Sequence, residues 1–487
     1  MQIYNSAHHQ KEEFKSIEPQ SIKMYVCGPT VYDQIHIGNA RTFFAFDVIR
    51  RYLIYRGYEV TFAQNVTDVD DKIINKAHET GKTPKEISEF YTKAFIEQMD
   101  RFGIMRPDIR PKATEEIAKM IEMISGLIDK GHAYESDGDV YFSVRSYPQY
   151  GEVSNRNIDE LLVGARIEAS SKKEDALDFA LWKKAKEGEP SWESPWGRGR
   201  PGWHSECSAM VRRYLGTPID IHGGGSDLAF PHHENEAAQA EACWDEELTH
   251  YWMHSGMLLV DGEKMSKSLG NFYTLKEVLD KYDKDAVRLL MLQTHYRSSL
   301  DFSFERLDGS TQSLERIKNA YRNLLWKAKQ AQAQKLDASA QELSNLIDHS
   351  YTEFREVMDD DFNTAKASAT LFNLVAASNK YLAEVSEAEA NAEVLTKAAQ
   401  ALKELYGVFG IDLEEAQELD SEVLVELAKK FGYDEDSPQS AQDFILATRA
   451  EARAQKDWAK ADSIRDELAE LSYTIEDTAA GSRLIKK

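Results

Sequence analysis

The segment IKMYVCGPTVYDQIHIGNARTFFAFDVIRRYLIYRGYEVTF, residues 22–62, predicts the centre of an α/β fold. Its first residues alternate apolar and polar side chains as a strand does, and the Gly-Pro pair that follows interrupts this pattern. From Asn39 apolar side chains recur at helical spacing beside a charged stripe, until Gly57 ends the helix and residues 58–62 form the next strand. This order predicts a βαβ unit, in which ligands bind beyond the carboxyl ends of the strands.

The string His36-Ile37-Gly38-Asn39 lies at the predicted start of this helix. Free backbone N–H groups and the helix dipole favour a phosphate at such a position. Gly38 has no Cβ and lets an adenine ring or a ribose approach the backbone, while His36 can donate a hydrogen bond to phosphate oxygens. Asn39 can also donate, or it can simply cap the helix. Taken alone, the string favours a nucleotide site and a plain helix start equally.

A second string of unusual composition, residues 264–268 (KMSKS), sets two lysines and two serines in a short polar loop. The ammonium groups of Lys264 and Lys267 suit negative charge that builds up on phosphates, and the small polar neighbours would let the loop close over a nucleotide. The alternative is a solvated lysine turn. A third string, residues 197–202, matches G-x-G-x-x-G but does not follow an apolar strand, so we expect a plain loop there.

The composition is that of a globular protein with an acidic surface. At 487 residues the chain is too long for one core, so about three or four domains are expected. It has no apolar run long enough to span a bilayer and no N-terminal signal pattern, which predicts a cytoplasmic protein. The net charge of −24 argues against loose binding to nucleic acid but leaves room for a local basic track. Three cysteines are too few for a disulfide framework and leave metal binding, catalysis or burial as their uses.

Two thiolates, one imidazole and one carboxylate make a candidate zinc set: Cys27, Cys207, His232 and Glu236. His232 and Glu236 are separated by one helical turn after Pro231, a residue well placed at a helix start, so both should project from one helix face. The four residues are far apart in the sequence, and this leaves other histidines and the third cysteine as competing candidates: His204, His222, His233 and Cys243. It also leaves open that Cys27 and Cys207 are buried as small apolar side chains.

Four longer strings stand out beside these motifs: residues 24–33 (MYVCGPTVYD), 65–72 (NVTDVDDK), 199–210 (GRPGWHSECSAM) and 220–236 (DIHGGGSDLAFPHHENE). With them the chain resembles the cysteinyl-tRNA synthetase family, and the resemblance runs through its whole length. Residues 36–39 are similar to the HIGH signature of class I aminoacyl-tRNA synthetases, and residues 264–268 to their KMSKS signature. The family usually has a second histidine where this chain has Asn39, whose amide cannot carry a charge.

The resemblance implies a role for each matching residue. It implies one zinc ion per chain that binds the thiolate of the substrate cysteine and is held by Cys27, Cys207, His232 and Glu236. It implies an amino-acid pocket lined by Thr67, Trp203 and His222. For ATP, which would bind with Mg²⁺, it implies contacts from His36, Gly38 and Lys267, and catalytic roles for His36, Asn39, Lys264 and Lys267.

The activity implied is that of a cysteine–tRNA ligase. Such an enzyme activates L-cysteine with ATP to cysteinyl-adenylate, releases pyrophosphate, and transfers cysteine to the 3′ end of tRNA(Cys). We expect a cytoplasmic monomer that does not bind membranes. Two alternatives stay open: a related ligase that joins cysteine to an amino sugar, and a non-catalytic RNA-binding protein descended from a synthetase.

The expected fold is α/β, with a Rossmann-like parallel-sheet catalytic domain that carries an insertion, then a helical bundle and a small C-terminal anticodon-binding domain. The expected boundaries are 1–112 and 201–304 for the two halves of the catalytic domain, 113–200 for the connective insertion, 305–411 for the bundle, and 412–487 for a linker and the C-terminal domain. In the last part the candidates for anticodon contacts are Arg449, Arg453, Trp458 and Arg465. The alternative there is a surface helix with a core tryptophan.

Overall fold

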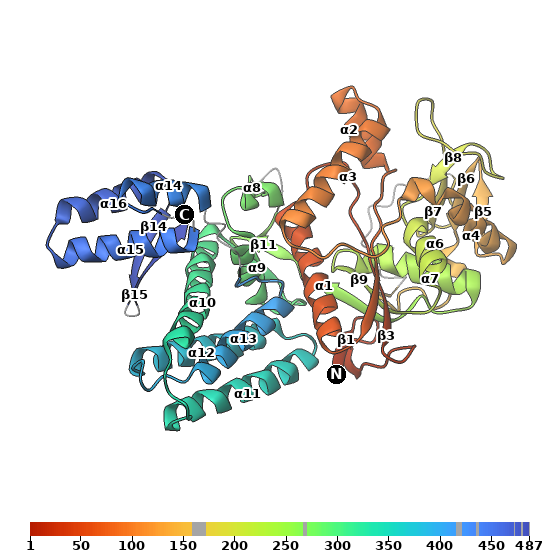
Figure 1. The fold of residues 1–487 in the computed structure, drawn as a ribbon. Coiled ribbons are helices and arrows are strands. Elements are labelled where there is room, and N and C mark those ends of the chain that lie inside the picture. The colour runs from red at the N-terminus through yellow and green to blue at the C-terminus, as the bar shows by residue number, and fades with distance from the viewer. Residues whose placement is uncertain are drawn as a thin grey trace. The chain divides into compact units, whose positions relative to one another are not determined.

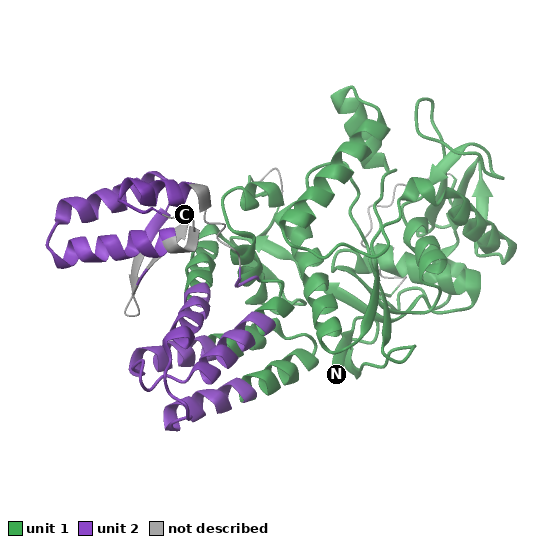
Figure 2. Ribbon diagram, in the orientation of Figure 1, with its two compact units in different colours: residues 1–316, 349–372, 405–411 green, residues 317–348, 373–404, 412–487 purple. Residues whose placement is uncertain are grey.

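The computed structural model describes residues 1–157, 172–265, 270–414, 421–434, 438–471, 473–478 and 481–486. The chain divides into two compact units (Figure 2). Unit 1 comprises residues 1–316, 349–372 and 405–411, and unit 2 comprises residues 317–348, 373–404 and 412–487. In the part of the chain that the structure describes, no helix is long and apolar enough to cross a membrane.

Unit 1 is built on a four-stranded parallel sheet with the order β10-β9-β3-β4 (Figure 1). Its strands are β3 (Ser21–Val26), β4 (Glu59–Ala63), β9 (Ile219–Gly225) and β10 (Thr249–Ser255). Helix α1 (Ile37–Tyr55) connects β3 to β4, so the predicted βαβ unit is confirmed. Every residue of β9 is buried, as expected of a central strand in a parallel sheet that is covered on both faces.

The carboxyl ends of β3 and β9 lie side by side. The strand register pairs Val26 with Gly223, and the N–H of Cys27 donates to the carbonyl oxygen of Gly223 at 3.1 Å. Gly223 has no room for a side chain, because a Cβ built there would lie 2.3 Å from the ring of Phe46. The side chains that follow these two strands therefore meet at one edge of the sheet.

A second, antiparallel sheet with the order β5-β6-β7-β8 is inserted between the halves of the parallel sheet. Its elements are β5 (Ala133–Ser136), β6 (Asp139–Phe142), β7 (Phe179–Lys184) and β8 (Gly199–Pro201), and α4 (Ile117–Asp129) shares their apolar core. Strand β8 falls inside residues 197–202, so the prediction of a plain loop is wrong for this part. Gly199 faces Trp182, whose indole nitrogen would lie 2.2 Å from a Cβ at that position.

The other elements of unit 1 flank these two sheets. On the N-terminal side they are β1 (Gln2–Asn5), β2 (Gln10–Glu13), α2 (Asp71–Thr80), α3 (Pro84–Arg101), η1 (Ala113–Glu115) and η2 (Val144–Ser146). Around the second half they are α6 (Ser205–Tyr214), η3 (Ala229–His233), α7 (Glu234–Trp244), β11 (Leu258–Val260), β12 (Glu263–Lys264), α8 (Leu275–Leu279), α9 (Lys284–Leu292) and β13 (Leu300–Phe302).

A buried ion pair ties α1 to α9 inside unit 1. Arg288 is fully buried and donates to the carboxylate of Asp47 at 2.6 Å, and Arg51 donates to the same carboxylate at 2.9 Å. Burial favours the neutral acid, but the charges of Arg288 and Arg51 outweigh it and lower the pKa of Asp47. Asp47 is therefore an ionised carboxylate in the core that supports α1.

The stretch after residue 303 is helical, as predicted. Its helices are α10 (Phe304–Gln330), α11 (Ala338–Asp359), α12 (Thr364–Glu384) and α13 (Ala392–Val408). The apolar residues at three- and four-residue spacing lie on buried faces, among them Leu314, Ile317, Leu371 and Leu374.

The C-terminal part of unit 2 has an apolar cluster of its own. It is formed by α14 (Ser421–Lys430), α15 (Pro438–Ala454), α16 (Trp458–Glu470) and the hairpin of β14 (Tyr473–Thr478) and β15 (Gly481–Lys486). Helix α14 lies in the acidic segment that was expected to be a linker, and it buries Leu424 and Leu427 in this cluster. Trp458 is 59% exposed at the start of α16, which excludes the alternative of a core tryptophan.

Candidate active site

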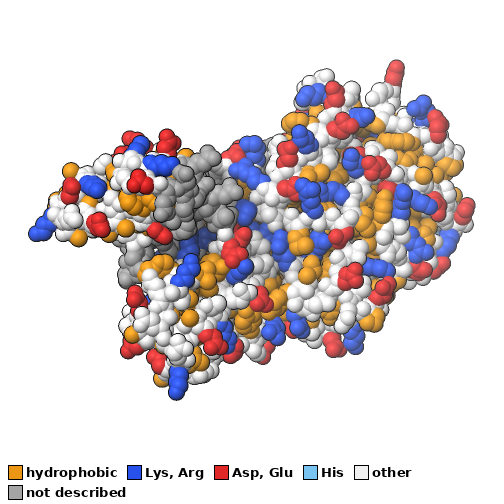
Figure 3. All heavy atoms as spheres, in the orientation of Figure 1, with side chains coloured by type: hydrophobic (Ala, Val, Ile, Leu, Met, Phe, Trp, Pro, Cys, Tyr) orange, Lys and Arg blue, Asp and Glu red, His pale blue; other side chains and the backbone are white. Residues whose placement is uncertain are grey.

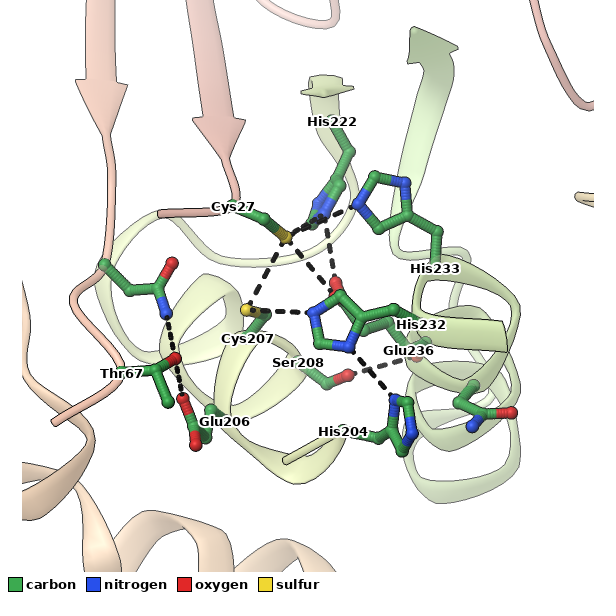
Figure 4. Close-up of polar contacts among 12 residues, drawn as sticks. Cys27, Thr67, His204, Glu206, Cys207, Ser208, His222, His232, His233 and Glu236 are labelled. Atoms are coloured by element: carbon green, nitrogen blue, oxygen red, sulfur yellow. Dashed lines mark hydrogen bonds and ion pairs between the residues drawn. The ribbon is translucent and has the colours of Figure 1, made fainter. Parts of the chain in front are cut away.

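The four predicted metal ligands meet at the carboxyl edge of the parallel sheet (Figure 4). They come from four segments, namely the end of β3 for Cys27, α6 for Cys207, η3 for His232 and α7 for Glu236. All four side chains are buried, and one ligand atom from each lies within 4.8 Å of the others. Burial as small apolar side chains therefore does not account for Cys27 and Cys207, because the sulfur atoms of both contact polar side chains.

The spacing of these ligand atoms fits a tetrahedral zinc ion. Zn–S bonds of about 2.3 Å and Zn–N or Zn–O bonds of about 2.0–2.2 Å place pairs of ligand atoms about 3.3–3.8 Å apart. Cys27 Sγ lies 3.6 Å from Cys207 Sγ and 3.4 Å from Glu236 Oε1, and Cys207 Sγ lies 3.7 Å from His232 Nε2. Of the four pairs with these distances, only His232 Nε2 and Glu236 Oε1 lie closer than about 3.3 Å, at 2.7 Å, and they form an ion pair. The two thiols, the imidazole and the carboxylate thus fit a zinc ion.

A second group of possible ligands shares two members with the first. Cys27 Sγ lies 3.6 Å from His222 Nε2 and 3.4 Å from His233 Nε2, and His222 Nε2 lies 3.0 Å from Glu236 Oε2. These four atoms also lie within 4.8 Å of one another, so His222 and His233 remain competitors as ligands. The other two competitors do not belong to either group. His204 Nδ1 lies 3.0 Å from His232 Nδ1, and Cys243 Sγ contacts the carbonyl oxygen of Met123 at 3.6 Å.

The helix geometry expected for His232 and Glu236 is wrong in detail. Pro231 does not start a regular α-helix, because residues 229–233 form a wider turn and α7 begins only at Glu234. His232 and Glu236 nevertheless approach each other, since α7 continues directly from this turn. Gly224 makes room for it, because a Cβ at that position would lie 2.8 Å from the ring of His233.

The protonation of the cluster reflects its burial and its mutual charges. Burial raises the pKa of the Cys27 thiol well above its ordinary value, and the neighbouring Cys207 raises it further. Burial also acts to raise the pKa of Cys207, but hydrogen bonds from Cys27 and His232 outweigh it and lower the pKa to about 7. Burial disfavours a charged His232, yet Glu236 and Cys207 raise its pKa to about 10. The protons on the Cys27 thiol and the His232 ring thus compete with a metal ion for the same atoms.

The residues that the family resemblance assigned to the amino-acid pocket surround this cluster. The indole of Trp203 stacks on the ring of His232 with centroids 4.3 Å apart and 16° between the planes. His222 reaches the cluster from β9, as described above. Thr67 follows β4 and donates to the carboxyl group of Glu206 at 2.6 Å, next to Cys207 (Figure 4). The structure therefore brings all three within one neighbourhood.

The string that begins α1 lines a separate cavity of about 140 Å³. Its walls come from the α1 start, the end of β9, the end of β10 and the start of the KMSKS string: His36, Gly38, Asn39, Thr42, Gly225–Asp227, Ser255–Leu258, Lys264 and Met265. A Cβ at Gly38 would lie 2.8 Å from Met265 Cε and 2.9 Å from His36 Nδ1. The absence of a side chain at Gly38 lets Met265 and the ring of His36 pack closely at the helix start. Both motifs found in the sequence thus border one cavity.

The helix start is held by a reciprocal pair of hydrogen bonds between His36 and Asn39. The N–H of Asn39 donates to His36 Nδ1 at 3.1 Å, and the N–H of His36 donates to Asn39 Oδ1 at 3.3 Å. His36 is thus the N-cap of α1, a position that the sequence alternative gave to Asn39. Burial lowers the pKa of His36, and its Nδ1 is an acceptor, so Nε2 carries the proton. The Asn39 oxygen is occupied, which leaves its NH₂ group as the available donor.

The chain after the KMSKS string is bonded to the same helix start. The N–H of Ile37 donates to the carbonyl oxygen of Tyr273 at 3.0 Å, and the N–H of Leu275 donates to that of Ile35 at 3.0 Å. Lys264 lines the cavity from β12, with its side chain exposed. Lys267, predicted to contact ATP, falls outside the described residues.

Strand β9 connects the two regions. His222 faces the metal-ligand cluster, and Gly225, at the end of the same strand, lines the cavity. Three residues of extended chain span about 10 Å. This separation suits a small amino acid that binds at the cluster and reacts with a nucleotide in the cavity.

Sequence reasoning missed several residues of the site. Asp227 lines the cavity and its charge acts on the pKa of His36. Its signal was the Gly-rich stretch at residues 223–227, within the string 220–236, to which no role in the cavity was given. Asn65 and Glu206 hold Thr67 between them, and although both lie in strings that stand out in the sequence, residues 65–72 and 199–210, no role was assigned to either.

Comparisons with known proteins agree with this arrangement. Residues 13–312 match the model of the tRNA synthetases class I (C) catalytic domain, residues 353–414 the DALR domain, and residues 437–483 the cysteinyl-tRNA ligase anticodon binding domain. The chain is similar to the cysteine–tRNA ligase of Desulforamulus reducens, with 46% identity over 491 residues that cover 100% of both chains. It is 47% identical over 483 residues to that of Geobacillus thermodenitrificans, which covers 99% of this chain and 98% of the relative.

A solved structure supports the fold. A methionyl-tRNA synthetase of Mycobacterium tuberculosis in complex with methionyl-adenylate superposes with a TM-score of 0.62 at 16% identity, covering 80% of this chain and 90% of that chain. The α/β architecture, its inserted antiparallel sheet and the helical parts that follow are therefore those of a class I synthetase. With a family model over more than half of the chain and full-length relatives at 46–47% identity, the chain belongs to the cysteine–tRNA ligase family.

Proposed function

We propose that this chain is a cysteine–tRNA ligase that activates L-cysteine with ATP and transfers it to the 3′ end of tRNA(Cys). One observation carries the proposal: a buried Cys/Cys/His/Glu cluster lies on the strand that also borders the cavity of the two signature motifs. The cluster offers a place for a thiol substrate, and the cavity offers one for ATP. Full-length similarity to cysteine–tRNA ligases supports the same activity.

The cluster explains how cysteine is chosen over serine. The two amino acids differ by one atom, and shape alone separates such near-isosteres by only about 1–3 kcal/mol. We assign Cys27, Cys207, His232 and Glu236 as ligands of one zinc ion per chain, which when bound supplies a soft Lewis acid that prefers a thiolate to a hydroxyl. A thiol of pKa about 8.5 also loses its proton far more readily than an alcohol.

The residues around the cluster then hold the rest of the amino acid. We assign Trp203, stacked on His232, and His222, on β9, to the walls of the amino-acid pocket. Thr67 completes the pocket from the β4 side, where its hydroxyl lies next to Glu206. None of these groups acts as a covalent nucleophile, since the attacking atom in the activation step is a carboxylate oxygen of the substrate.

The cavity residues position ATP for attack on its α-phosphate. Gly38 admits the nucleotide close to the backbone, and the Nε2–H of His36 and the NH₂ of Asn39 donate to phosphate oxygens. Lys264 and Lys267 would place positive charge beside the negative charge that develops on the leaving pyrophosphate. Mg²⁺ would bind the oxygens of the same group. A bond forms between the carboxylate oxygen of cysteine and the α-phosphorus as the bond from the α-phosphorus to pyrophosphate breaks. The terminal ribose hydroxyl of the tRNA then attacks the carbonyl carbon of the adenylate, and AMP leaves.

The parts beyond the parallel sheet would serve the tRNA. We propose the division 1–112, 113–200, 201–304, 305–411 and 412–487, with the last part contacting the anticodon. The exposed Trp458 and Arg465 suit stacking on unpaired bases and hydrogen bonds to them, and Arg449 and Arg453 lie on the preceding helix. On the face drawn in Figure 3 basic and acidic side chains are interspersed, so the net charge of −24 leaves room for contacts with a phosphate backbone. We place the enzyme in the cytoplasm, where tRNA is used, as a monomer.

Two other activities were compatible with the site. A ligase that joins cysteine to an amino sugar would use the same cluster and cavity but has no use for an anticodon-binding part, whose family model matches residues 437–483. A non-catalytic RNA-binding relative has no need to keep His36 and Asn39 aimed into a nucleotide cavity.

The test separates the three activities by their substrates. Purified protein should exchange pyrophosphate into ATP when cysteine is present and far less with serine, and it should charge tRNA(Cys). Metal analysis should find one zinc per chain. Exchange without tRNA charging would point to another acceptor, and absence of exchange would rule out a ligase.

A further inference from the structure

A chain of hydrogen bonds joins the two segments that carry the cysteines. The N–H of Gly28 donates to Asn65 Oδ1 at 2.7 Å, Asn65 Nδ2 donates to Thr67 Oγ1 at 3.3 Å, and Thr67 Oγ1 donates to Glu206 Oε2 at 2.6 Å. Gly28 directly follows Cys27, and Glu206 directly precedes Cys207. The side chains of Asn65, Thr67 and Glu206 are only 1%, 2% and 0% exposed. The chain therefore lies in the protein interior beside the metal-ligand cluster.

The directions of the first two bonds in this chain are fixed by the first donor. A backbone N–H can only donate, so the oxygen of Asn65 must face Gly28 and its NH₂ group must face Thr67. Thr67 accepts that bond and gives its single proton to Glu206. A hydroxyl has one proton and two lone pairs, so one lone pair of Thr67 stays available. Any further partner of Thr67 must therefore be a donor.

Glu206 shows a second unfilled position. Its Oε1 is buried and has no hydrogen-bond partner among the described residues. A buried polar atom without a partner is unfavourable, so a donor that arrives with a ligand would bind there. When Glu206 is ionised, the two neighbouring side chains thus offer acceptors and no donor. Of the polar groups on an amino acid, only the α-ammonium can satisfy them, because the α-carboxylate only accepts.

We propose that Asn65 and Glu206 are positioning residues for the α-ammonium group of the substrate, which act by making Thr67 Oγ1 an obligatory acceptor. The inference rests on the proposed function, since it assumes that cysteine binds beside Thr67. It adds that the pocket reads cysteine at two places, the thiol at the metal-ligand cluster and the ammonium at Thr67 and Glu206.

The test compares cysteine with 3-mercaptopropionate, which keeps the thiol and the carboxylate but lacks the amino group. The metal content, the cysteine KM and the inhibition constant of 3-mercaptopropionate are measured for the intact protein and for Thr67→Val and Glu206→Gln. Both variants should weaken cysteine binding by about 10- to 100-fold, the range for a hydrogen bond to a charged group, and leave 3-mercaptopropionate and ATP unaffected. Thr67→Ser, which keeps the hydroxyl, should restore most of the preference for cysteine.

Glu116→Gln serves as the matched control. Glu116 is another fully buried carboxylate of unit 1, and it binds Tyr214 and Arg213, outside this hydrogen-bonded chain. Its substitution should leave the ratio of cysteine to 3-mercaptopropionate affinity unchanged. If Thr67→Val and Glu206→Gln weaken both ligands equally, or neither, the inference is overturned. In the first case the hydrogen-bonded chain only holds the two cysteine segments together.

A measurement without variants covers the case in which a substitution prevents folding. In the intact protein, removal of the amino group should weaken binding more than methylation of the carboxylate in cysteine methyl ester, which keeps the ammonium. The reverse order would overturn the inference. If the intact protein shows no cysteine-dependent exchange at all, the proposed function itself fails, and the two failures are thereby distinguished.

Discussion

The metal-ligand cluster and the nucleotide cavity lie on the same sheet but are assembled in opposite ways. The cluster takes one buried residue from each of four segments, separated by up to about two hundred residues, and every ligand atom has a partner within the cluster. In the cavity, residues 36–39 are set by a local capping box and the walls remain partly open. The cluster therefore depends on the whole of unit 1, while the helix start that we propose to bind the nucleotide depends mainly on its own backbone. Substitutions in one region should therefore change its binding or activity without changing that of the other region.

The largest effect is expected from Asp47→Asn, because both regions share the scaffold that this residue supports. The substitution leaves Arg288 buried without its charge partner, which should lower the free energy of unfolding by about 3–5 kcal/mol. Urea denaturation measures it. Asp280→Asn, which removes an exposed partner of Lys276 and Arg101, is the control and should lower it far less. Equal effects of the two substitutions would contradict the role of the buried pair.

The same residue predicts a pH dependence. The pKa of Asp47 is lower in the folded chain than the value of about 3.9 in an unfolded chain, so its ionisation stabilises the fold above that value. This stabilisation is lost as the pH falls through the folded pKa. The stability difference between the intact protein and Asp47→Asn should therefore be largest at neutral pH and should shrink below about pH 4. A difference that grows on acidification would contradict this assignment.

The next largest effect, on cysteine binding, is expected from Cys207→Ser. Loss of a thiolate ligand should weaken metal and cysteine binding by at least about 100-fold. Substitution of a residue that merely hydrogen-bonds to a ligand already weakens metal binding by up to about that factor. The ATP KM should change little, since the cavity lies about 10 Å further along β9 than the cluster. Metal analysis and exchange kinetics measure these effects, and Cys243→Ser, outside the cluster, is the control. Full zinc content with unchanged cysteine affinity would exclude Cys207 as a ligand.

Asn39→Asp should affect the cavity and spare the cluster. Aspartate keeps the oxygen that caps His36 but replaces the NH₂ donor with a negative charge near the phosphates, so exchange should slow by about 10-fold, or about 1.4 kcal/mol. The thermal midpoint should not fall, because an acid near a helix N-terminus is stabilising. Asn39→Ala loses both groups and should lower stability as well. An unchanged exchange rate in Asn39→Asp would show that the amide does not contact the phosphates.

The smallest effect is expected from Trp458→Ala, far along the chain from both regions. If this exposed ring stacks on an anticodon base, the KM for tRNA(Cys) should rise about fivefold, or about 1 kcal/mol. Cysteine-dependent exchange and stability should stay the same, because the ring is not part of a core. Trp458→Phe keeps a stacking surface and should recover most of the loss. No change in the tRNA KM would remove Trp458 from the anticodon contacts.

Local signals in the sequence were enough for the βαβ unit and for the two signature strings. These signals involve only residues close in sequence: the strand and helix periods, the glycine at the helix end and the residues around Gly38. The observed β3, α1 and β4 agree with them. The four metal ligands were named from chemistry and family resemblance, and the structure brings them together. It also brings His222 and His233 within reach of Cys27 and Glu236, as a second group of four possible ligands.

Other features were decided only when distant segments packed against each other. Gly199 became part of a strand because it faces Trp182, and Leu424 and Leu427 made a helix of an acidic segment by joining the C-terminal apolar cluster. Asn65 and Glu206 lie in strings that stand out in the sequence, but their relation to Thr67 exists only because the segment after β4 and helix α6 meet at the site. Backbone periodicity and capping are short-range and can be predicted from neighbouring residues, whereas hydrogen bonds and packing between remote segments require the folded chain.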